Sequence, residues 1–313
     1  MQRADAEAMK VLVADDDLVS RRLLESSLSK SGYRVVVAAD GTEALRLLDG
    51  PDCPRLAVLD WIMPGENGVE VCRKLRQKAQ EPYVYVILLS MKGLQDEIVE
   101  GLEAGANDYV IKPCDLQELQ ARVRAGKRIL ELHDQLVSTR EQLRVQATHD
   151  SLTECVNRRA VLETLDKEVT RSVRQDVPIG VIMVDIDRFK ATNDTYGHLA
   201  GDAVLRETSK RMRDSVRSYD TVGRYGGEEF LIVVPGCGMK EIVDLAERLR
   251  VCVAKEPIRV EQGDIFATIS LGVAIRENEL KDSEALLRAA DEALYSAKHA
   301  GRNRVHSHVQ APA

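Results

Sequence analysis

The chain has 313 residues, of which 44% are hydrophobic and 30% charged, and its formal net charge is −7. This length favours about two domains, and the mild acidity argues against general nucleic-acid binding, so we expect no DNA partner. The polar N-terminus lacks a signal-peptide core, and no apolar run approaches the ~20 residues that span a bilayer. The six cysteines are scattered, which fits a reducing compartment. We therefore expect a cytoplasmic protein with no membrane partner.

Short apolar runs alternate with amphipathic stretches in the first part of the chain. We predict a helix at 18–31, further helices between the strands, and strands at 10–14, 33–38, 56–59, 84–89 and 108–111. Unbroken Val, Ile and Leu runs separated by helices indicate a doubly wound α/β domain, whose parallel sheet is covered on both faces. Ligands of such folds bind beyond the carboxyl ends of the strands, and acidic residues occur there.

The stretch 116–148 contains neither proline nor strand alternation, which predicts one long helix. Gly126 interrupts it, and Ile129, Leu136 and Leu143 recur at seven-residue intervals, forming a short and imperfect apolar seam. The pattern favours a parallel coiled coil that joins two subunits into a homodimer. The alternative is a connecting helix that packs on its own domain.

The second half of the chain has a different pattern. We predict strands at 179–186, 221–225, 229–234 and 266–275, and helices at about 200–217, 240–254 and 283–300. Gly226 and Gly227 separate two of the strands, which is typical of a hairpin. The order indicates an α+β domain with an antiparallel component.

Three groups of polar residues converge if the first sheet is doubly wound. An acidic triplet that includes Asp15 and Asp16 follows the first strand, Asp60 ends the third, and Lys112 follows the fifth. Clustered carboxylates repel one another unless a cation such as Mg²⁺ lies among them. Asp60 would then be a nucleophile for a phosphoryl group, which Lys112 and the Ser90 hydroxyl would bind. An acid triplet alone is more often a helix cap.

With these motifs, residues 9–125 resemble the receiver domain of two-component response regulators. The resemblance implies Asp60 as the phosphoacceptor and a cognate histidine kinase or other phosphodonor as a partner. It implies Mg²⁺ (or Mn²⁺) held by Asp15, Asp16, Asp60 and the Ile62 carbonyl, and a switch formed by Ser90, Tyr109 and Lys112. Met91 stands where many members have a small residue, and it either slows dephosphorylation or has no effect.

A second acidic group lies in the second half. Asp185 and Asp187 end a strand, and Gly226 and Gly227 precede Glu228 and Glu229. If the two strands are neighbours, Asp185 and Glu228 meet beside a backbone carbonyl, which suits Mg²⁺ carrying a nucleoside triphosphate. Glycines let the backbone approach phosphate and base closely. Alone, the Gly-Gly-Glu-Glu sequence is a hairpin turn; further motifs at 185–190 and 193–202 favour the functional interpretation.

The second half resembles the GGDEF family of diguanylate cyclases, in its GGEEF form, over about residues 148–308. The match includes Asp150-x-Leu152-Thr153-x-x-x-Asn157-Arg158-Arg159, Ala290-Asp291-x-Ala293-Leu294-Tyr295-x-Ala297-Lys298 and Gly301-Arg302-Asn303. The resemblance implies that two GTP molecules, one per subunit, condense into cyclic di-GMP and two pyrophosphates across a symmetric dimer. We predict tails at 1–8 and 309–313, a receiver domain at 9–125, a coiled-coil linker at 116–148 and a GGDEF domain at 149–308.

The resemblance also implies roles for single residues. Mg²⁺ (or Mn²⁺) would be held by Asp185, the Ile186 carbonyl and Glu228; Glu228 would also deprotonate the 3′-hydroxyl, with support from Glu229. Substrate binding would involve Asn193 and Asp202 at the guanine, Gly226 and Gly227 in the turn, and Lys190, Lys298, Arg302 and the amides around Phe189 at the phosphates. One departure is Glu154-Cys155-Val156 in place of the usual Gly-Leu-Pro, which bears on coupling rather than chemistry.

An Arg-x-x-Asp sequence, Arg217 to Asp220, precedes Gly226 by five intervening residues. In the family this spacing marks an inhibitory site where cyclic di-GMP docks, since arginine can grip phosphate and aspartate the base edge. Arg248 falls where an arginine of the partner completes that site. The alternative is that these are ordinary solvated charges, because the tetrapeptide is common.

The leading hypothesis is therefore a phosphorylation-controlled diguanylate cyclase. Phosphorylation could reorient a fixed dimer or make a monomer dimerise. The main alternative is a non-catalytic module that senses cyclic di-GMP through Arg217 and Asp220. A DNA-binding regulator is a remote third possibility, because the second half has no helix-turn-helix pattern with a basic face.

Overall fold

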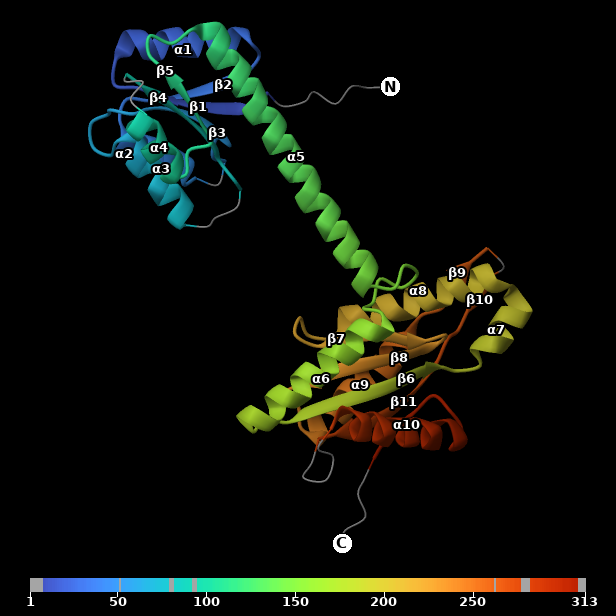
Figure 1. Cartoon of the computed structure of the whole chain (residues 1–313). Helices are drawn as coiled ribbons and strands as arrows, with labels where there is room; N and C mark the ends of the chain where they lie inside the picture. Colours follow the sequence, from blue (N-terminus) through green and yellow to red (C-terminus); the bar gives the residue numbers. More distant parts are fainter. Residues whose placement is uncertain are drawn as a thin grey trace. The chain divides into compact units, whose positions relative to one another are not determined.

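The computed structural model describes residues 8–50, 52–78, 82–91, 95–261, 263–276 and 282–308, and of residues 95–97 it describes the backbone alone. The chain divides into two compact units, and the division falls between Arg140 and Glu141 (Figure 1). Among the described residues, no helix has both the length and the apolar character needed to cross a membrane.

The first unit contains a five-stranded parallel sheet with strand order β2-β1-β3-β4-β5. Its strands are β1 (Lys10–Ala14), β2 (Arg34–Ala38), β3 (Leu56–Asp60), β4 (Tyr85–Ser90) and β5 (Asp108–Ile111). Its helices are α1 (Leu18–Lys30), α2 (Gly41–Leu48), α3 (Gly68–Gln77), α4 (Gln95–Glu103) and the first part of α5 (Leu116–Thr148). The doubly wound α/β fold is confirmed.

Both faces of this sheet are buried, which explains the unbroken apolar runs. Alternate strand residues such as Leu12 and Leu59 form one core, and Val11 and Val58 form the other. Helix α5 contributes to the second core despite the glycine in its middle. A methyl group on Gly126 would lie 2.7 Å from the Tyr85 ring, so the glycine lets α5 pack closely on the sheet.

The second unit contains a mixed sheet with strand order β12-β11-β6-β8-β7. The strands are β6 (Ile179–Ile186), β7 (Thr221–Gly226), β8 (Glu229–Pro235), β11 (Ile269–Ile275) and β12 (Val305–Ser307). The central strand β6 is antiparallel to β8 and β11, and β12 runs parallel to β11. A separate antiparallel pair consists of β9 (Ile258–Val260) and β10 (Gly263–Ile265). The predicted α+β class is confirmed.

Helices cover both faces of this sheet (Figure 1). One core includes α8 (His198–Ser215) and α9 (Met239–Lys255), and the other includes α6 (Arg158–Gln175) and α10 (Ser283–His299). Helix α7 (Phe189–Tyr196) follows β6 directly. The strand predicted at 266–275 begins only at Ile269, because its neighbour β6 ends at the paired residue Ile186.

Candidate functional site

The predicted acidic pocket of the first unit forms at the carboxyl ends of the strands. Asp15 and Asp60 are buried, and Asp16 is exposed. One carboxylate oxygen from each of these three residues lies within 4.8 Å of the others. Oxygen atoms in such a cluster are the ligands that hard divalent cations prefer, so the residues fit the metal that the sequence predicts.

Lys112 closes this pocket from the end of β5. Its Nζ atom lies 2.9 Å from Asp15 Oδ2 and 2.7 Å from Asp60 Oδ2. Burial raises the pKa of Asp60, and the charges of Asp15 and Asp16 add to this effect, while Lys112 opposes it. A cation at the cluster would therefore stabilise the ionised carboxylates.

The remaining predicted receiver residues lie around the pocket. Ser90 is buried at the end of β4, and its carbonyl accepts a hydrogen bond from the Lys112 backbone N–H at 2.7 Å. The Tyr109 ring is partly buried, with the Arg122 guanidinium carbon 5.8 Å from its centroid. The Ile62 and Met91 side chains are both exposed.

In the second unit, the two predicted acidic segments meet at one end of the sheet. Strand pairing places Asp185 opposite Glu229, and the Ile186 N–H donates to the Glu228 carbonyl at 3.3 Å. The Asp185 side chain is buried, and Glu228 and Glu229 are half-buried. The register thus brings together residues that lie more than forty positions apart in the sequence.

The charges of this site favour an added cation. Burial raises the pKa of Asp185, and Glu228 and Asp187 raise it further, against the effect of Lys298. The pKa of Glu229 is also raised, by burial and by Asp185. Lys298 of α10, predicted as a phosphate ligand, has its Nζ atom 2.7 Å from Asp185 Oδ2. A half-buried group of like charges with one lysine fits a divalent ion bound by oxygen atoms.

The predicted substrate-binding residues lie on α7, α8 and α10, in the turn before β8 and in the loop after α10. Phe189 is buried at the first position of α7, whereas Lys190 and Arg302 are exposed. Asn193 and Asp202 are half-buried on the neighbouring helices α7 and α8. Gly226 and Gly227 are exposed in the turn, where a methyl group on either would meet no other described atom within 4 Å.

The Asp187 carboxylate forms hydrogen bonds that the sequence analysis did not predict. Its carboxylate accepts hydrogen bonds from Thr268 Oγ1 at 2.7 Å, Ser270 Oγ at 2.6 Å and the Asn303 N–H at 2.9 Å. Asp187 therefore anchors the loop that carries Arg302 instead of joining Asp185 as a free acid. The available signal was a pair of polar residues in an otherwise apolar stretch, Thr268 just before β11 and Ser270 within it.

The predicted inhibitory residues lie near the end of α8. The Arg217 N–H donates to Asp220 Oδ2 at 2.9 Å, and its guanidinium donates to the Tyr219 hydroxyl at 2.7 Å. Asp220 Oδ1 is buried and has no hydrogen-bond partner among the described residues. Arg248 of α9 donates to the Ser215 carbonyl at 3.1 Å, so it lies close to this segment within one chain.

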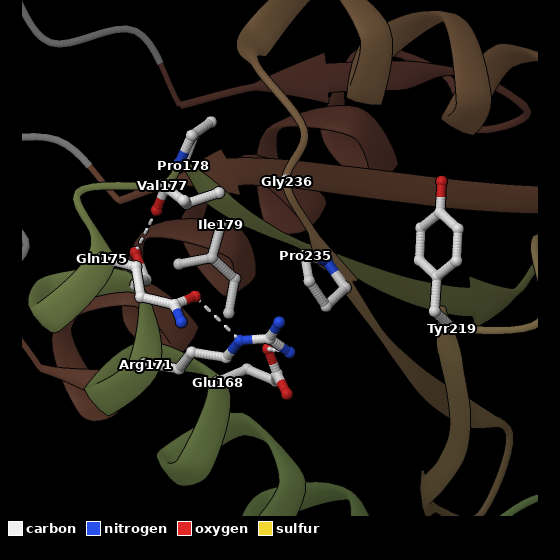
Figure 2. Close-up of a pocket in the computed structure, with 10 residues that line it drawn as sticks. Glu168, Arg171, Gln175, Val177, Pro178, Ile179, Tyr219, Pro235 and Gly236 are labelled. Carbon is white, nitrogen blue, oxygen red and sulfur yellow. Dashed lines mark hydrogen bonds and ion pairs between the residues drawn. The ribbon is translucent and has the colours of Figure 1, made fainter.

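A pocket of about 430 Å³ that the sequence did not predict adjoins this segment. Figure 2 shows Tyr219 across the pocket from Arg171, with Pro235 between them. Arg171 is held on α6 by Glu168, at 3.7 Å, and by the Gln175 side chain. An aromatic ring and a guanidinium on facing walls suit a planar base with nearby phosphate.

Comparison with known proteins agrees with this geometry. Residues 147–304 match the family model described as diguanylate cyclase, GGDEF domain, and residues 11–124 match the response regulator receiver domain. The chain is 33% identical over 305 residues to the response regulator PleD of Caulobacter vibrioides, covering 97% of this chain and 66% of PleD. It is 43% identical over 157 residues to the diguanylate cyclase DosC of Escherichia coli, covering 50% of this chain and 34% of DosC.

A solved structure is similar as well. The coiled coil and GGDEF domain of DgcB from Caulobacter crescentus, in complex with c-di-GMP, aligns with a TM-score of 0.55 and 31% identity. That alignment covers 60% of this chain and 98% of the DgcB chain. The chain therefore belongs to the GGDEF family of diguanylate cyclases and carries a response regulator receiver domain ahead of its GGDEF domain.

Proposed function

We propose that the chain is a diguanylate cyclase that condenses two GTP molecules into cyclic di-GMP and two pyrophosphates across a symmetric homodimer. The β6–β8 register carries the proposal, because it sets Asp185 beside Glu228 and Glu229 at a half-buried sheet end. Each domain would bind one GTP, so two domains must face each other for both bonds to form.

The acidic residues would act at the reacting atoms. Asp185, the Ile186 carbonyl and Glu228 would hold Mg²⁺ (or Mn²⁺), which neutralises triphosphate charge and acidifies a bound hydroxyl. Glu228 would accept the proton of the attacking 3′-hydroxyl. Glu229, whose pKa is raised, would support the site from the adjoining position on β8.

Polar groups around this centre would recognise GTP. The Asn193 amide and the Asp202 carboxylate would bind the guanine edge, and a carboxylate accepts from the N1–H and amino group that adenine lacks in this arrangement. The phosphates would be bound by Lys190, Lys298, Arg302 and the backbone amides around Phe189. The open space beside Gly226 and Gly227 leaves room for close approach of the nucleotide.

Turnover of GTP tests the proposal. The purified chain is incubated with GTP and Mg²⁺, with and without an acyl-phosphate donor, and the products are identified by mass spectrometry. Cyclic di-GMP together with two pyrophosphates is the expected result. Binding of cyclic di-GMP without turnover would instead identify a sensor.

Replacing Gly201 with alanine should weaken GTP binding without weakening the fold. The added methyl group would lie 1.8 Å from Asn193 Oδ1. It would therefore displace the Asn193 amide, which is proposed to bind the guanine edge. We expect the KM for GTP to rise about tenfold, the effect of losing about one hydrogen bond. Alanine favours a helix over glycine, so Tm should not fall. The double variant Gly201→Ala/Asn193→Ala should match Asn193→Ala alone, and an unchanged KM in Gly201→Ala would contradict this role.

Phosphorylation of Asp60 would control the enzyme. The receiver domain (9–125) would act on the GGDEF domain (149–308) through the helix α5. On that helix, Ile129, Leu136 and Leu143 are 45%, 68% and 60% exposed. An exposed apolar seam of this spacing supports pairing with the same seam of a second copy.

Cyclic di-GMP would inhibit the enzyme at Arg217 and Asp220, helped by Arg248 of the partner. Asp220 Oδ1, which has no hydrogen-bond partner in the described ranges, and the adjoining pocket support this proposal. Replacing Arg217 with alanine should raise the product concentration for half-inhibition at least about tenfold, since it removes a charge-assisted contact to phosphate. Inhibition curves check this, with Arg259→Ala as the control at an exposed arginine of β9. Identical inhibition curves for Arg217→Ala and wild type would contradict an inhibitory site at Arg217.

A further inference from the structure

The segment 150–156 joins the end of α5 to the GGDEF sheet. The Val156 N–H donates to the Val222 carbonyl at 3.2 Å, and the Arg224 N–H donates to the Val156 carbonyl at 2.8 Å. These bonds attach the segment alongside β7 (Figure 1). The last residue of β7, Gly226, opens the turn 226–229. The backbone that follows the long helix is thus hydrogen-bonded to the strand that enters the turn.

The Arg224 side chain extends this connection into the turn itself. Its Nη1 atom lies 3.0 and 3.2 Å from the two carboxylate oxygens of Asp150, and its Nε donates to the Gly227 carbonyl at 2.9 Å. Burial raises the pKa of Asp150, but hydrogen bonds from Thr153 and Arg224 outweigh this and hold that pKa below its ordinary value. Asp150 is therefore a fixed anion at the end of α5, and one planar guanidinium joins it to the turn.

The other contacts of the turn in the described part of the chain include backbone pairing, such as the hydrogen bond from the Ile186 N–H to the Glu228 carbonyl at 3.3 Å. The β7–β8 register shifts between Arg224 and Gly226, so regular strand pairing is interrupted just before it. Added methyl groups on Gly226 and Gly227 would meet no other described atom within 4 Å, so the Cβ positions of these residues face open space. Tyr225, at the shift, lies under the guanidinium of Arg158, with 4.6 Å from the guanidinium carbon to the ring centroid.

One unusual residue of this segment, Val156, strengthens its attachment to β7. Val156 stands where the family usually has proline, and proline has no N–H to donate to the Val222 carbonyl. Glu154 stands where glycine is usual and adopts a φ of 58°. Its carboxylate pairs with Arg213 at 3.1 Å, and because the Glu154 side chain is 77% exposed, this pair contributes little to stability.

We infer that Arg224 is a positioning residue, which fixes the turn carrying Glu228 relative to Asp150 at the end of α5. This inference rests on the proposed cyclase function. Movement of the helix end would reach the metal-binding glutamate through Asp150, Arg224 and the Gly227 carbonyl. A displacement of about 1 Å at reacting groups can lower a rate about 100-fold. The contacts of Arg224 with Asp150 and the Gly227 carbonyl would therefore control turnover.

Replacing Arg224 with lysine tests the inference, because lysine keeps the charge but cannot contact both Asp150 and Gly227 in one plane. We expect kcat to fall about 10- to 100-fold, with the KM for GTP within about twofold of wild type. Asp150→Asn should likewise lower kcat and leave the KM for GTP nearly unchanged. The double variant should lower kcat no further than either single variant, because the two residues act as a unit. Activity is measured at least ~10 °C below each Tm.

Arg213→Ala is the matched control, since Arg213 pairs with Glu154 in the same segment but the pair does not extend to the turn. Its kcat should stay within about twofold of wild type. Equal kcat values for the Arg224→Lys, Asp150→Asn and Arg213→Ala variants would overturn the inference. If Arg224→Lys fails to fold, the kcat of Asp150→Asn alone tests the inference. A wild-type chain without turnover would instead contradict the proposed function itself.

Discussion

Replacing Glu228 with glutamine is expected to lower kcat for cyclic di-GMP synthesis at least about 1,000-fold. The amide has nearly the same shape but carries no charge for the metal and cannot accept the proton of the 3′-hydroxyl. Glu228 is half-buried in the turn that precedes β8, where its charge acts on Asp185. Pyrophosphate release and chromatography of the products measure the loss.

Two controls separate this chemical loss from a loss of fold. Tm of Glu228→Gln should remain near that of wild type, because removing one charge from a cluster of acids relieves repulsion. Glu163→Gln changes an exposed glutamate of α6, which pairs with Arg159, and should leave synthesis unchanged. Synthesis by Glu228→Gln above about a tenth of the wild-type rate would undermine the metal assignment.

Replacing Asp60 with asparagine is expected to abolish stimulation by an acyl-phosphate donor and to leave basal synthesis intact. An amide is not a nucleophile for a phosphoryl group, and the cyclase residues belong to the other unit of the chain. The rate with donor divided by the rate without donor is the quantity to measure. For the variant this ratio should equal one.

Asp49→Asn provides the matched control, because Asp49 is an exposed aspartate at the end of α2 that pairs with Lys78. Its stimulation ratio should equal that of wild type. Incorporation of radiolabelled phosphate should occur in this variant and be lost in Asp60→Asn. If Asp60→Asn is stimulated as strongly as wild type, Asp60 is not the control site.

Local patterns were sufficient to predict most of the strands. β5, β6 and the long helix α5 match their predicted bounds, because continuous apolar runs and a proline-free stretch mark them in the sequence. Helix α6 was not predicted, although Val161, Leu165 and Val169 at four-residue spacing are all buried. The three-residue strands β9, β10 and β12 are too short to carry a periodic signal.

The candidate site was predictable where it depends on strand ends. Asp185 and Glu228 meet because β6 and β8 are neighbours, which the sequence analysis could state only as a condition, since the hairpin at the two glycines pairs β7 with β8. The contacts of Asp187, Lys298 and Arg224 were not predictable. Each one joins elements far apart in the sequence, such as Asp187 with Asn303 on the loop after α10, and only the full strand order brings them together.

Binding of Mn²⁺ in the presence of a non-hydrolysable GTP analogue tests the central claim most directly. Electron paramagnetic resonance measures the Mn²⁺ that binds only when the analogue is present, which excludes the receiver site from the signal. We expect Asp185→Asn and Glu228→Gln each to weaken this binding at least about tenfold. Wild-type affinity in both variants would contradict a divalent ion shared by these two residues.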